Sequence, residues 1–459
     1  MSIRRVLPAL LLAGVTALAV HSRAAAASCE LAITHVNLVP MTAETILPDR
    51  TVRIQGGRIA TIVKTRSGGP HCQVTIDGHG GYLLPGLNDL HMHLDTEAFA
   101  QAMRLKAAPV DFPGALAPYL ANGITGVRVM SGAPDILAFR NRERAVGSVL
   151  PRMMVASPML SGAPPVIPEP LTRVVTTPEA AWAAVDEYAS AGYDFIKVRD
   201  NLKAPVLRAA IEEARRRGLY VDGHLSQGQG LSVADVLAAG QHGVAHIDNL
   251  ALAMTSDDDA ARFAKLLVAC GCLVSTTLQV EANAVEQIER YDAMIARPGV
   301  RLMDPALVAA FWAKPNNGYI AGKADPAFFR DLLTKDGLLL RTFVAAGVHV
   351  VAGTDALNPM ILPGESLHDE LEAMVAAGLT PYQALRTATA SPAAFVPGFA
   401  DVGELVAGKA ANAVLVAGDP LKDLTTTRTP LAVMSGGRWL TVEMLARRLE
   451  RAAASYAGK

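Results

Sequence analysis

The chain lacks the features that mark nucleic-acid-binding, zinc-finger and membrane-spanning proteins. Its 459 residues carry 42 basic and 43 acidic side chains, and lysine and arginine are scattered rather than clustered. This distribution argues against a nucleic-acid partner. The four cysteines have no zinc-finger spacing, and beyond the N-terminus no apolar run reaches the roughly 20 residues that cross a bilayer. We therefore predict a small-molecule substrate, no nucleic acid and no stable membrane span in the mature chain, and we leave a homo-oligomer open.

The first 27 residues have the pattern of a signal peptide. Arg4 and Arg5 are followed by an apolar stretch from Val6 to Val20 and by small residues from Ala24 to Ala27. We therefore expect export to the periplasm or the medium. A membrane anchor is the alternative, but this apolar stretch is short for a span. A lipoprotein attached at Cys29 stays open.

The remaining chain is long and apolar enough for a large core, since 51% of its residues are hydrophobic. Residues 28–84 alternate in short runs broken by turn residues, which predicts a small β unit. Strand and helix patterns then alternate over residues 85–400, and eight such units predict a (β/α)8 TIM barrel. Short strands and a C-terminal helix follow in residues 401–459. We expect the two end segments to build one small β-sandwich domain.

We predict different oxidation states for the two pairs of cysteines. Cys29 and Cys72 lie at the edges of predicted strands in the N-terminal unit, so an exported chain could join them in a disulfide. Cys270 and Cys272 lie in ACGCLV, which we interpret as an apolar strand. Alternation would point both to one face, and we expect buried free thiols there rather than a metal pair.

The stretch LLPGLNDLHMHLD places two histidines at the end of an apolar strand. Residues two apart in a strand face the same side, so His91 and His93 should both point into the mouth of the barrel and can chelate one ion. Other polar residues fall at the ends of later predicted strands, namely Lys197, His224, His246 and Asp355. Because the carboxyl ends of barrel strands form one face, these side chains should meet there.

This set of residue types predicts a metal centre. Neutral imidazoles and a carboxylate favour a divalent transition metal, zinc first. Four histidines and one aspartate exceed what one tetrahedral catalytic ion needs, which indicates two ions. Lys197 could become a ligand by adding carbon dioxide to its neutral amine, and the carbamate could bridge both ions. The alternative is an ordinary ion pair between Lys197 and a neighbouring acid.

At this point the chain resembles the amidohydrolase superfamily, in its prolidase-like and imidazolonepropionase-like branch. The motifs that carry the resemblance are PGLNDLHMH, GYDFIKV, GHLS, AHIDN, GTDA, ELEAMVAAGLTPYQALRTAT and GELVAGKAANAVLVAGDPL. The resemblance implies that His91, His93 and Asp355 hold the more buried ion. It also implies that His224 and His246 hold the other ion and that carboxylated Lys197 bridges the two. Asp355 would in addition shuttle a proton from the bridging water to the leaving amine.

The motifs also depart from the family pattern. His224 is followed by Leu225-Ser226 rather than a second histidine and glycine, and His246 is followed by Ile247-Asp248-Asn249 rather than Glu-His-Gly-like text. Both changes lie in loops that face the substrate, so the identity of the substrate does not transfer from the family.

We predict a hydrolase that cleaves a C–N bond of a dipeptide, an N-acyl amino acid or a related small molecule by attack of a metal-bridging hydroxide. A lactam or ester hydrolase on the same centre, a mononuclear deaminase and a non-catalytic barrel scaffold are the alternatives. A deaminase normally lacks the strand-four lysine, and a scaffold would not keep the complete ligand set.

Three further residues are candidate substrate contacts. Arg128 could bind a substrate carboxylate or brace the barrel floor through an internal ion pair, and we favour bracing. Tyr319, on a long insertion over residues 280–347, could close over the substrate. His368 could face the mouth or lie on the first turn of a helix. A proline-rich loop, residues 162–170, should form a wall of the site.

Overall fold

The structure, a computed structural model, describes residues 29–66, 72–94, 104 and 111–456. The expected signal peptide lies outside the described residues. No helix within these ranges is both long and apolar enough to cross a membrane.

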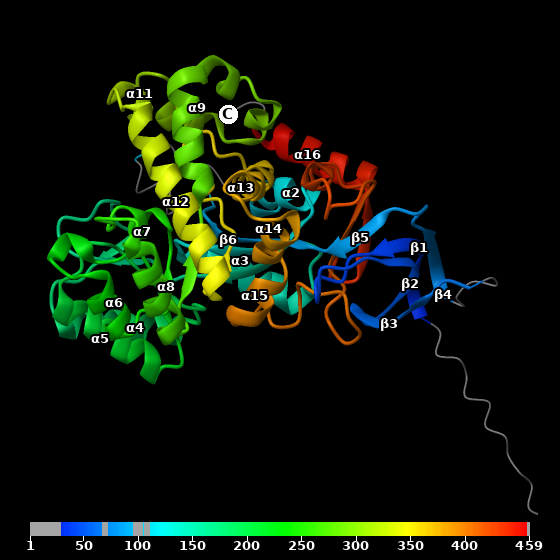
Figure 1. Ribbon diagram of the computed structural model, residues 1–459, viewed down its shortest axis with the longest axis horizontal. Helices are drawn as coiled ribbons and strands as arrows, with labels where there is room; N and C mark the ends of the chain where they lie inside the picture. Colours follow the sequence, from blue (N-terminus) through cyan, green and yellow to red (C-terminus); the bar gives the residue numbers. More distant parts are fainter. Residues whose placement is uncertain (1–28, 67–71, 95–103, 105–110, 457–459) are drawn as a thin grey trace, which may run out of the picture.

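Both ends of the described chain contribute to one sheet of eight strands (Figure 1). Its order is β18-β17-β16-β5-β1-β2-β3, and β4 also pairs with β1. β1 pairs with β4 along its first half and with β5 at its end, so the sheet forks on that side. The strands are β1 (Cys29–Leu38), β2 (Leu47–Gln55), β3 (Arg58–Lys64), β4 (Cys72–Asp77), β5 (Tyr82–Pro85), β16 (Ala413–Val416), β17 (Ala432–Ser435) and β18 (Arg438–Thr441).

Ten parallel strands form the centre of the molecule in two hydrogen-bonded groups, β6-β7-β8 and β10-β9-β11-β12-β13-β14-β15. Parallel bridges join the groups at two places, Met92 to Ala356 and Ala156 to Phe195. The strands are β6 (Leu87–Met92), β7 (Ile124–Val129), β8 (Arg152–Val155), β9 (Met159–Ser161), β10 (Thr172–Val174), β11 (Ile196–Val198), β12 (Val221–Gly223), β13 (Gly243–Val244), β14 (Leu273–Ser275) and β15 (His349–Val351).

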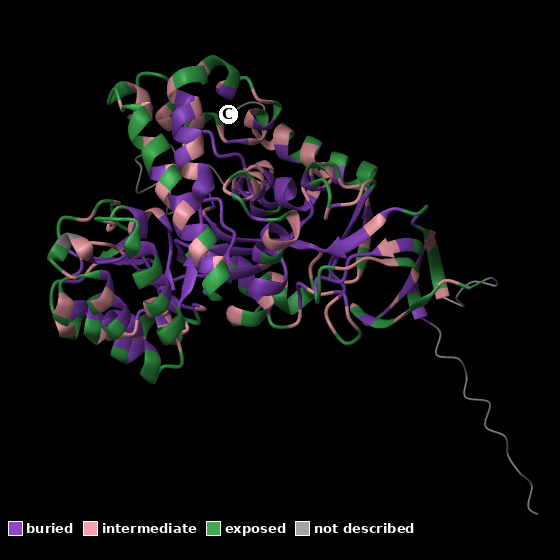
Figure 2. Ribbon diagram, in the orientation of Figure 1, coloured by how far each residue is buried: buried purple, intermediate pink, exposed green. Residues whose placement is uncertain are grey.

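Amphipathic helices cover the parallel strands and turn their polar faces to solvent (Figure 2). In α5, for example, the buried residues Val206, Leu207, Ala210, Ile211 and Ala214 recur at helical spacing along one face. The helices are α2 (Phe112–Ala121), α3 (Pro134–Val146), α4 (Pro178–Ala191), α5 (Ala204–Arg216), α6 (Val233–Ala239), α7 (Asp248–Ala251), α8 (Asp258–Cys270), α13 (Glu365–Ala376), α14 (Pro381–Ala388), α15 (Ala390–Phe395) and α16 (Val442–Tyr456).

The predicted insertion between the last two strands is mostly helical. Two long helices, α9 (Leu278–Ile295) and α12 (Pro326–Ala346), pack side by side, as Figure 1 shows. Between them lie α10 (Pro305–Leu307), the π-helical turn Val308–Trp312 and α11 (Gly318–Ala321). This helical layer carries residues that reach the candidate site.

The junction between the two sheets lies inside the stretch that contains the paired histidines. β5 belongs to the eight-stranded sheet and β6 to the parallel strands, and Gly86 separates them. A Cβ atom at Gly86 would lie 2.2 Å from Thr125 Oγ1, so only glycine lets β7 approach this closely. The chain therefore passes from one sheet to the other at Gly86.

The cysteines form two disulfides in the described chain. Cys29–Cys72 joins β1 to β4, where the two residues are register partners, so the expected pairing is present. The prediction of free thiols at Cys270 and Cys272 is wrong, because these two are also bonded to each other. Cys270 ends α8 rather than lying in a strand, and Gly271 (φ 62°) turns the chain so that both sulfurs meet.

Candidate metal centre

Three predicted ligands meet at the carboxyl ends of β6 and β15. Asp355 Oδ1 lies 3.3 Å from His91 Nε2 and 2.8 Å from His93 Nε2. Potential ligand atoms of these three residues all lie within 4.8 Å of one another. His91 is fully buried and Asp355 almost so, whereas His93 is partly open to the cavity. This spacing is short enough for one ion to contact all three.

The backbone around Asp355 is held in an unusual conformation. Asp355 has a φ of 56°, in the left-handed region that non-glycine residues rarely adopt. Its N–H and that of Thr354 both donate to the carbonyl of His91, at 2.7 and 3.0 Å. The buried Asp89 carboxylate accepts from Thr354 N–H and Oγ1. These bonds offset the local strain and fix the Asp355 carboxylate beside the histidines.

His224 and His246 extend the cluster across the strand ends. The His246 ring lies 4.3 Å from that of His91 and 4.7 Å from that of His224, centroid to centroid. Both residues follow short parallel strands, β12 and β13, at the same end as His91. Burial, above all, lowers the pKa of both imidazoles, and the neighbouring histidine lowers it further. Neutral imidazoles are the form that binds a metal.

In three of the imidazoles, Nδ1 makes a hydrogen bond. His91 Nδ1 donates to the carbonyl of Ala245 at 2.7 Å, His93 Nδ1 lies 2.7 Å from Ser131 Oγ, and His246 Nδ1 lies 3.0 Å from Thr277 Oγ1. Such partners orient a metal-binding histidine and leave Nε2 free for the ion. They are distant in sequence, and sequence analysis did not identify them.

Lys197 adds a buried amine to this group. The residue lies on β11, lines the same cavity, is only 1% exposed, and its Nζ has no hydrogen-bond partner within the described chain. Burial lowers the pKa of Lys197 to about 7, although Asp222 and Asp355 oppose the shift. The ion pairs recorded among the described residues do not include Lys197, so the alternative of an ordinary ion pair is not what the structure has. The amine is therefore substantially neutral near pH 7.

Three buried nitrogen atoms without hydrogen-bond partners bear on whether these residues suit a metal ion. His91 Nε2, His224 Nδ1 and Lys197 Nζ are buried and have no hydrogen-bond partner among the described residues. Leaving buried polar atoms unpaired is costly, and a metal ion is one explanation for such atoms when they gather at one place. Imidazole nitrogens together with a carboxylate are the donors that zinc and similar divalent ions prefer. The residues present therefore fit a metal centre.

Arg199 is a site residue that sequence analysis missed. It lies two residues after Lys197, its Nη1 is 3.1 Å from His224 Nε2, and its Nε has no hydrogen-bond partner in the described chain. Its nearest acid, Asp200, is 3.7 Å away and half exposed. The guanidinium thus keeps much of its positive charge available to the site.

These side chains open onto a cavity of about 390 Å³. Its polar lining residues include His93, Ser131, Lys197, Arg199, His224, His246, Asp355 and Asn358, and its apolar lining residues are Met159, Ile167, Leu171, Phe311, Leu357 and Pro359. Ile167 belongs to the proline-rich loop and Phe311 to the insertion, so both segments predicted to border the site do so. A small molecule with one apolar group and one anionic group suits this lining.

Two of the three candidate substrate contacts are turned away from the cavity. Arg128 is buried, donates from Nε to the Leu90 carbonyl at 2.6 Å, and pairs through Nη1 with Asp222 Oδ2 at 2.6 Å. It therefore braces the strands, which is the role we favoured. His368, on α13, lies between Thr427 Oγ1 and the carbonyl of Asn122, at 3.1 and 3.0 Å. His368 therefore lies on the first turn of a helix, one of the two placements we had left open, and it is buried away from the described lining of the cavity.

Tyr319, the third candidate, lies on α11 beside the cavity. Its ring packs edge-on against Phe329 with the centroids 5.4 Å apart, and its neighbour Gly318 lines the cavity. A substrate contact by Tyr319 stays a prediction.

Comparison with known proteins agrees with this geometry. The sequence pattern of the Amidohydrolase family matches residues 82–440. An adenine deaminase from Chelativorans sp. (strain BNC1) is 34% identical over 79 residues, which are 17% of this chain and 13% of that protein. The chain thus matches only a small part of this curated relative.

Solved structures resemble the chain over nearly its whole length. Bottromycin amidohydrolase has a TM-score of 0.70 at 22% identity, covering 93% of this chain and 90% of its own. A prolidase complexed with N-methylphosphonate-L-proline has a TM-score of 0.68 at 20% identity, covering 90% and 99%. The ochratoxinase of A. niger has a TM-score of 0.65 at 20% identity, covering 90% and 96%. At these identities the likeness establishes the fold alone, whereas the family match is the evidence that this chain belongs to the amidohydrolase family, as a hydrolase acting on C–N bonds.

Proposed function

We propose that the protein hydrolyses the amide bond of a dipeptide, an N-acyl amino acid or a related small molecule, using two divalent metal ions. The observation that carries this proposal is the convergence of three imidazoles, Asp355 and a buried unpaired lysine on one cavity, with the fourth imidazole, His91, packed against His246. One of the structural neighbours is a prolidase complexed with N-methylphosphonate-L-proline, which is consistent with such a substrate.

The residues divide into two ligand groups. His91, His93 and Asp355 would hold one ion, and His224 and His246 the other. Lys197 would bridge them as a carbamate, because a neutral amine is the form that reacts with carbon dioxide. Zinc is the first candidate metal. When bound, the ions would lower the pKa of a water molecule and polarise the substrate carbonyl.

The protein's own groups would then position the substrate and move the proton. Asp355 takes a proton from the attacking water and gives it to the leaving amine. Asn358 Nδ2 donates to Asp355 Oδ2 at 2.5 Å, which leaves Oδ1 to face the histidines. Arg199 pairs with a carboxylate of the substrate. The apolar wall around Met159 and Phe311 receives a side chain or acyl group.

We also propose that eight of the parallel strands close into a (β/α)8 barrel. The order would be β6, β7, β8, β11, β12, β13, β14 and β15. Support comes from the Ala156–Phe195 bridge, which connects the end of β8 to the start of β11, and the Met92–Ala356 bridge, which connects β6 to the end of β15. The forked eight-stranded sheet would be the sandwich beside it.

Export to an oxidising compartment is part of the same proposal. Two disulfides in the described chain support it, since disulfides persist mainly outside the cytosol. Expression with residues 1–27 fused to a reporter enzyme that works only after export tests it. Reporter activity confined to the cytoplasm would contradict export.

Metal content and turnover together test the activity. The purified protein, loaded with zinc and bicarbonate, is assayed against dipeptides and N-acyl amino acids. About two ions per chain and release of a free amino acid are expected. Lys197→Ala and Asp355→Asn should each abolish turnover. One ion per chain with release of ammonia would favour a deaminase, and no bound metal would refute the hydrolase.

A further inference from the structure

A second cavity lies at the opposite end of the parallel strands from the metal centre. It measures about 300 Å³. Tyr220, His242 and Cys272 line it, and each precedes a parallel strand, β12, β13 and β14 respectively. Two of the predicted metal ligands, His224 and His246, follow β12 and β13 at their other ends, so this cavity does not belong to the hydrolytic site.

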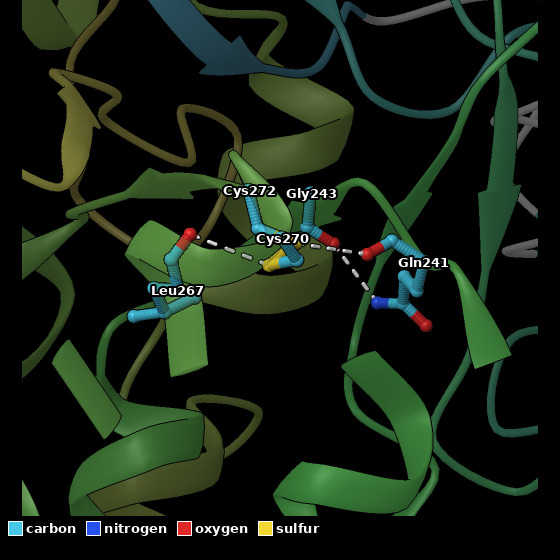
Figure 3. The surroundings of a disulfide bond; sticks show 5 residues. All are labelled: Gln241, Gly243, Leu267, Cys270 and Cys272. Atoms are coloured by element: carbon cyan, nitrogen blue, oxygen red, sulfur yellow. Dashed lines mark hydrogen bonds between the residues drawn. A yellow bond between two sulfur atoms is a disulfide. The ribbon is translucent and has the colours of Figure 1, made fainter. Parts of the chain in front are cut away.

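The Cys270–Cys272 disulfide forms part of the wall of this cavity (Figure 3). Cys270 is exposed at the end of α8, whereas Cys272 is buried with an exposure of 2%. Cys272 Sγ lies 3.4 Å from the carbonyl oxygen of Gln241, and Cys270 Sγ lies 3.3 Å from that of Leu267. One sulfur is therefore open to attack and the other is held in the interior.

This bridge is poorly suited to a purely structural role. Its cysteines are only 2 residues apart in sequence, whereas those of Cys29–Cys72 are 43 apart. The stabilisation that a disulfide gives by restricting the unfolded chain grows with the length of the loop it closes. A three-residue loop restricts little, and exposed disulfides are commonly the labile ones.

The lining of this cavity carries a cation. Arg215 lines it and has no ion pair within the described chain, whereas burial lowers the pKa of His242 and favours its neutral form. None of the lining residues within the described ranges is acidic. A reagent that carries a negative charge besides its sulfur would therefore be attracted to this cavity.

We propose that Cys270–Cys272 is a thiol–disulfide exchange site for small anionic thiols. The thiolate of a first molecule attacks Cys270 Sγ, the Cys270–Cys272 bond breaks, and Cys272 leaves as a thiolate that takes a proton from solvent. A second thiolate attacks the external sulfur of the mixed disulfide on Cys270 and releases the oxidised small molecule. Two thiols thus supply the two electrons, and the protein retains two cysteine thiols. This site is independent of the proposed hydrolase activity.

The first test compares the two disulfides within the folded full chain. The protein is exposed to 2-mercaptoethanesulfonate, free thiols are alkylated at intervals, and the modified peptides are quantified by mass spectrometry. Cys270 and Cys272 should become alkylated at least about tenfold faster than Cys29 and Cys72. Equal rates, or alkylation of Cys270 and Cys272 before any thiol is added, would overturn the proposal.

The second test addresses charge selection. Rates with anionic 2-mercaptoethanesulfonate, neutral 2-mercaptoethanol and cationic cysteamine are each divided by the rate of the same thiol with an oxidised peptide of sequence ACGCL, residues 269–273. The protein should prefer the anionic thiol by about fivefold, the factor for one ion pair near water. Arg215→Gln should remove this preference without changing the rate with mercaptoethanol. A ratio independent of thiol charge would refute the anionic class.

A trapping experiment identifies the sulfur that is attacked. Cys272→Ser leaves Cys270 without a resolving partner, so the mixed disulfide between Cys270 and mercaptoethanesulfonate should accumulate when its oxidised dimer is supplied. In Cys270→Ser the buried Cys272 should be modified at least about tenfold more slowly. The opposite order would place the attack on Cys272 and contradict the proposed geometry.

Discussion

Replacement of Lys197 by methionine should stabilise the metal-free protein, by an amount that depends on pH. The Lys197 pKa falls from 10.5 to about 7 on burial. Between these values the unfolded chain holds a proton on this amine and the folded chain does not. Each pH unit in this window is worth about 1.4 kcal/mol. The lowered pKa of Lys197 therefore reduces the free energy of unfolding by about 5 kcal/mol at and below pH 7, and by nothing above pH 10.5.

The direction in which stability changes with pH follows from the number of protons bound in the folded and the unfolded state. Because the unfolded state binds more protons inside the window, stability from this residue rises as the pH rises from 7 towards 10.5. Methionine fills a similar volume without an ionisable group, so Lys197→Met removes the penalty. The variant should exceed the parent by about 5 kcal/mol at pH 7, and this advantage should shrink steadily above that pH.

Urea unfolding at pH 7, 8, 9 and 10 measures this difference. The chain is first treated with a chelator and kept in buffers free of carbon dioxide, so that neither metal nor carbamate contributes. Lys197→Arg serves as the matched control, because it restores a charge that stays protonated throughout and should be less stable than the parent. A parent–methionine difference that is constant with pH would show that Lys197 is not an amine with a lowered pKa.

Three further outcomes follow from the structure. Asp222→Asn should lower the free energy of unfolding by about 3–5 kcal/mol, because it leaves the buried Arg128 without its ion-pair partner. The double variant Arg128→Met with Asp222→Leu should recover most of that loss. A loss below about 1 kcal/mol on thermal or urea unfolding would contradict the bracing role of Arg128. Arg199→Gln should raise KM for dipeptides at least about tenfold, because one charge-assisted hydrogen bond is lost. Hydrolysis of the corresponding C-terminal amides should stay nearly unchanged. An equal effect on both kinds of substrate would show that Arg199 does not pair with the substrate carboxylate. The lengths of the loops that the two disulfides close predict different losses of stability. The double variant Cys29→Ser with Cys72→Ser should lose about 4 kcal/mol, and Cys270→Ser with Cys272→Ser about 2 kcal/mol. Urea unfolding of both double variants tests this order.

The strand-end ligands could be predicted because local rules place them. Spacing of two in a strand puts His91 and His93 on one side, and the carboxyl ends of parallel strands lie together. Neither rule needs a distant contact to be known. Similar rules gave much of the order of strands and helices, since most of the buried parallel strands are short apolar runs followed by a helix.

The supporting contacts could not be predicted, because they join residues far apart in the chain. Ser131, Thr277 and the Ala245 carbonyl hold three imidazoles, and 31 to 154 residues separate each from its histidine. The placement of His368 was left open, and the pairing of Cys270 was predicted wrongly, for a related reason. Each lies at the border of a helix, where the side it presents depends on the packing of the helix rather than on the period of the sequence.

Arg199 was missed although the rule that finds it had already been used. The side chains of His91 and His93 share a face because they are two apart in a strand. Lys197 and Arg199 are also two apart at the end of β11, and both line the cavity. The guanidinium differs from the other predicted site residues in being a cation that cannot be a metal ligand. Arg199 therefore fits none of the roles of a metal ligand, whereas the negative charge of a substrate carboxylate calls for such a cation at this face of the strands.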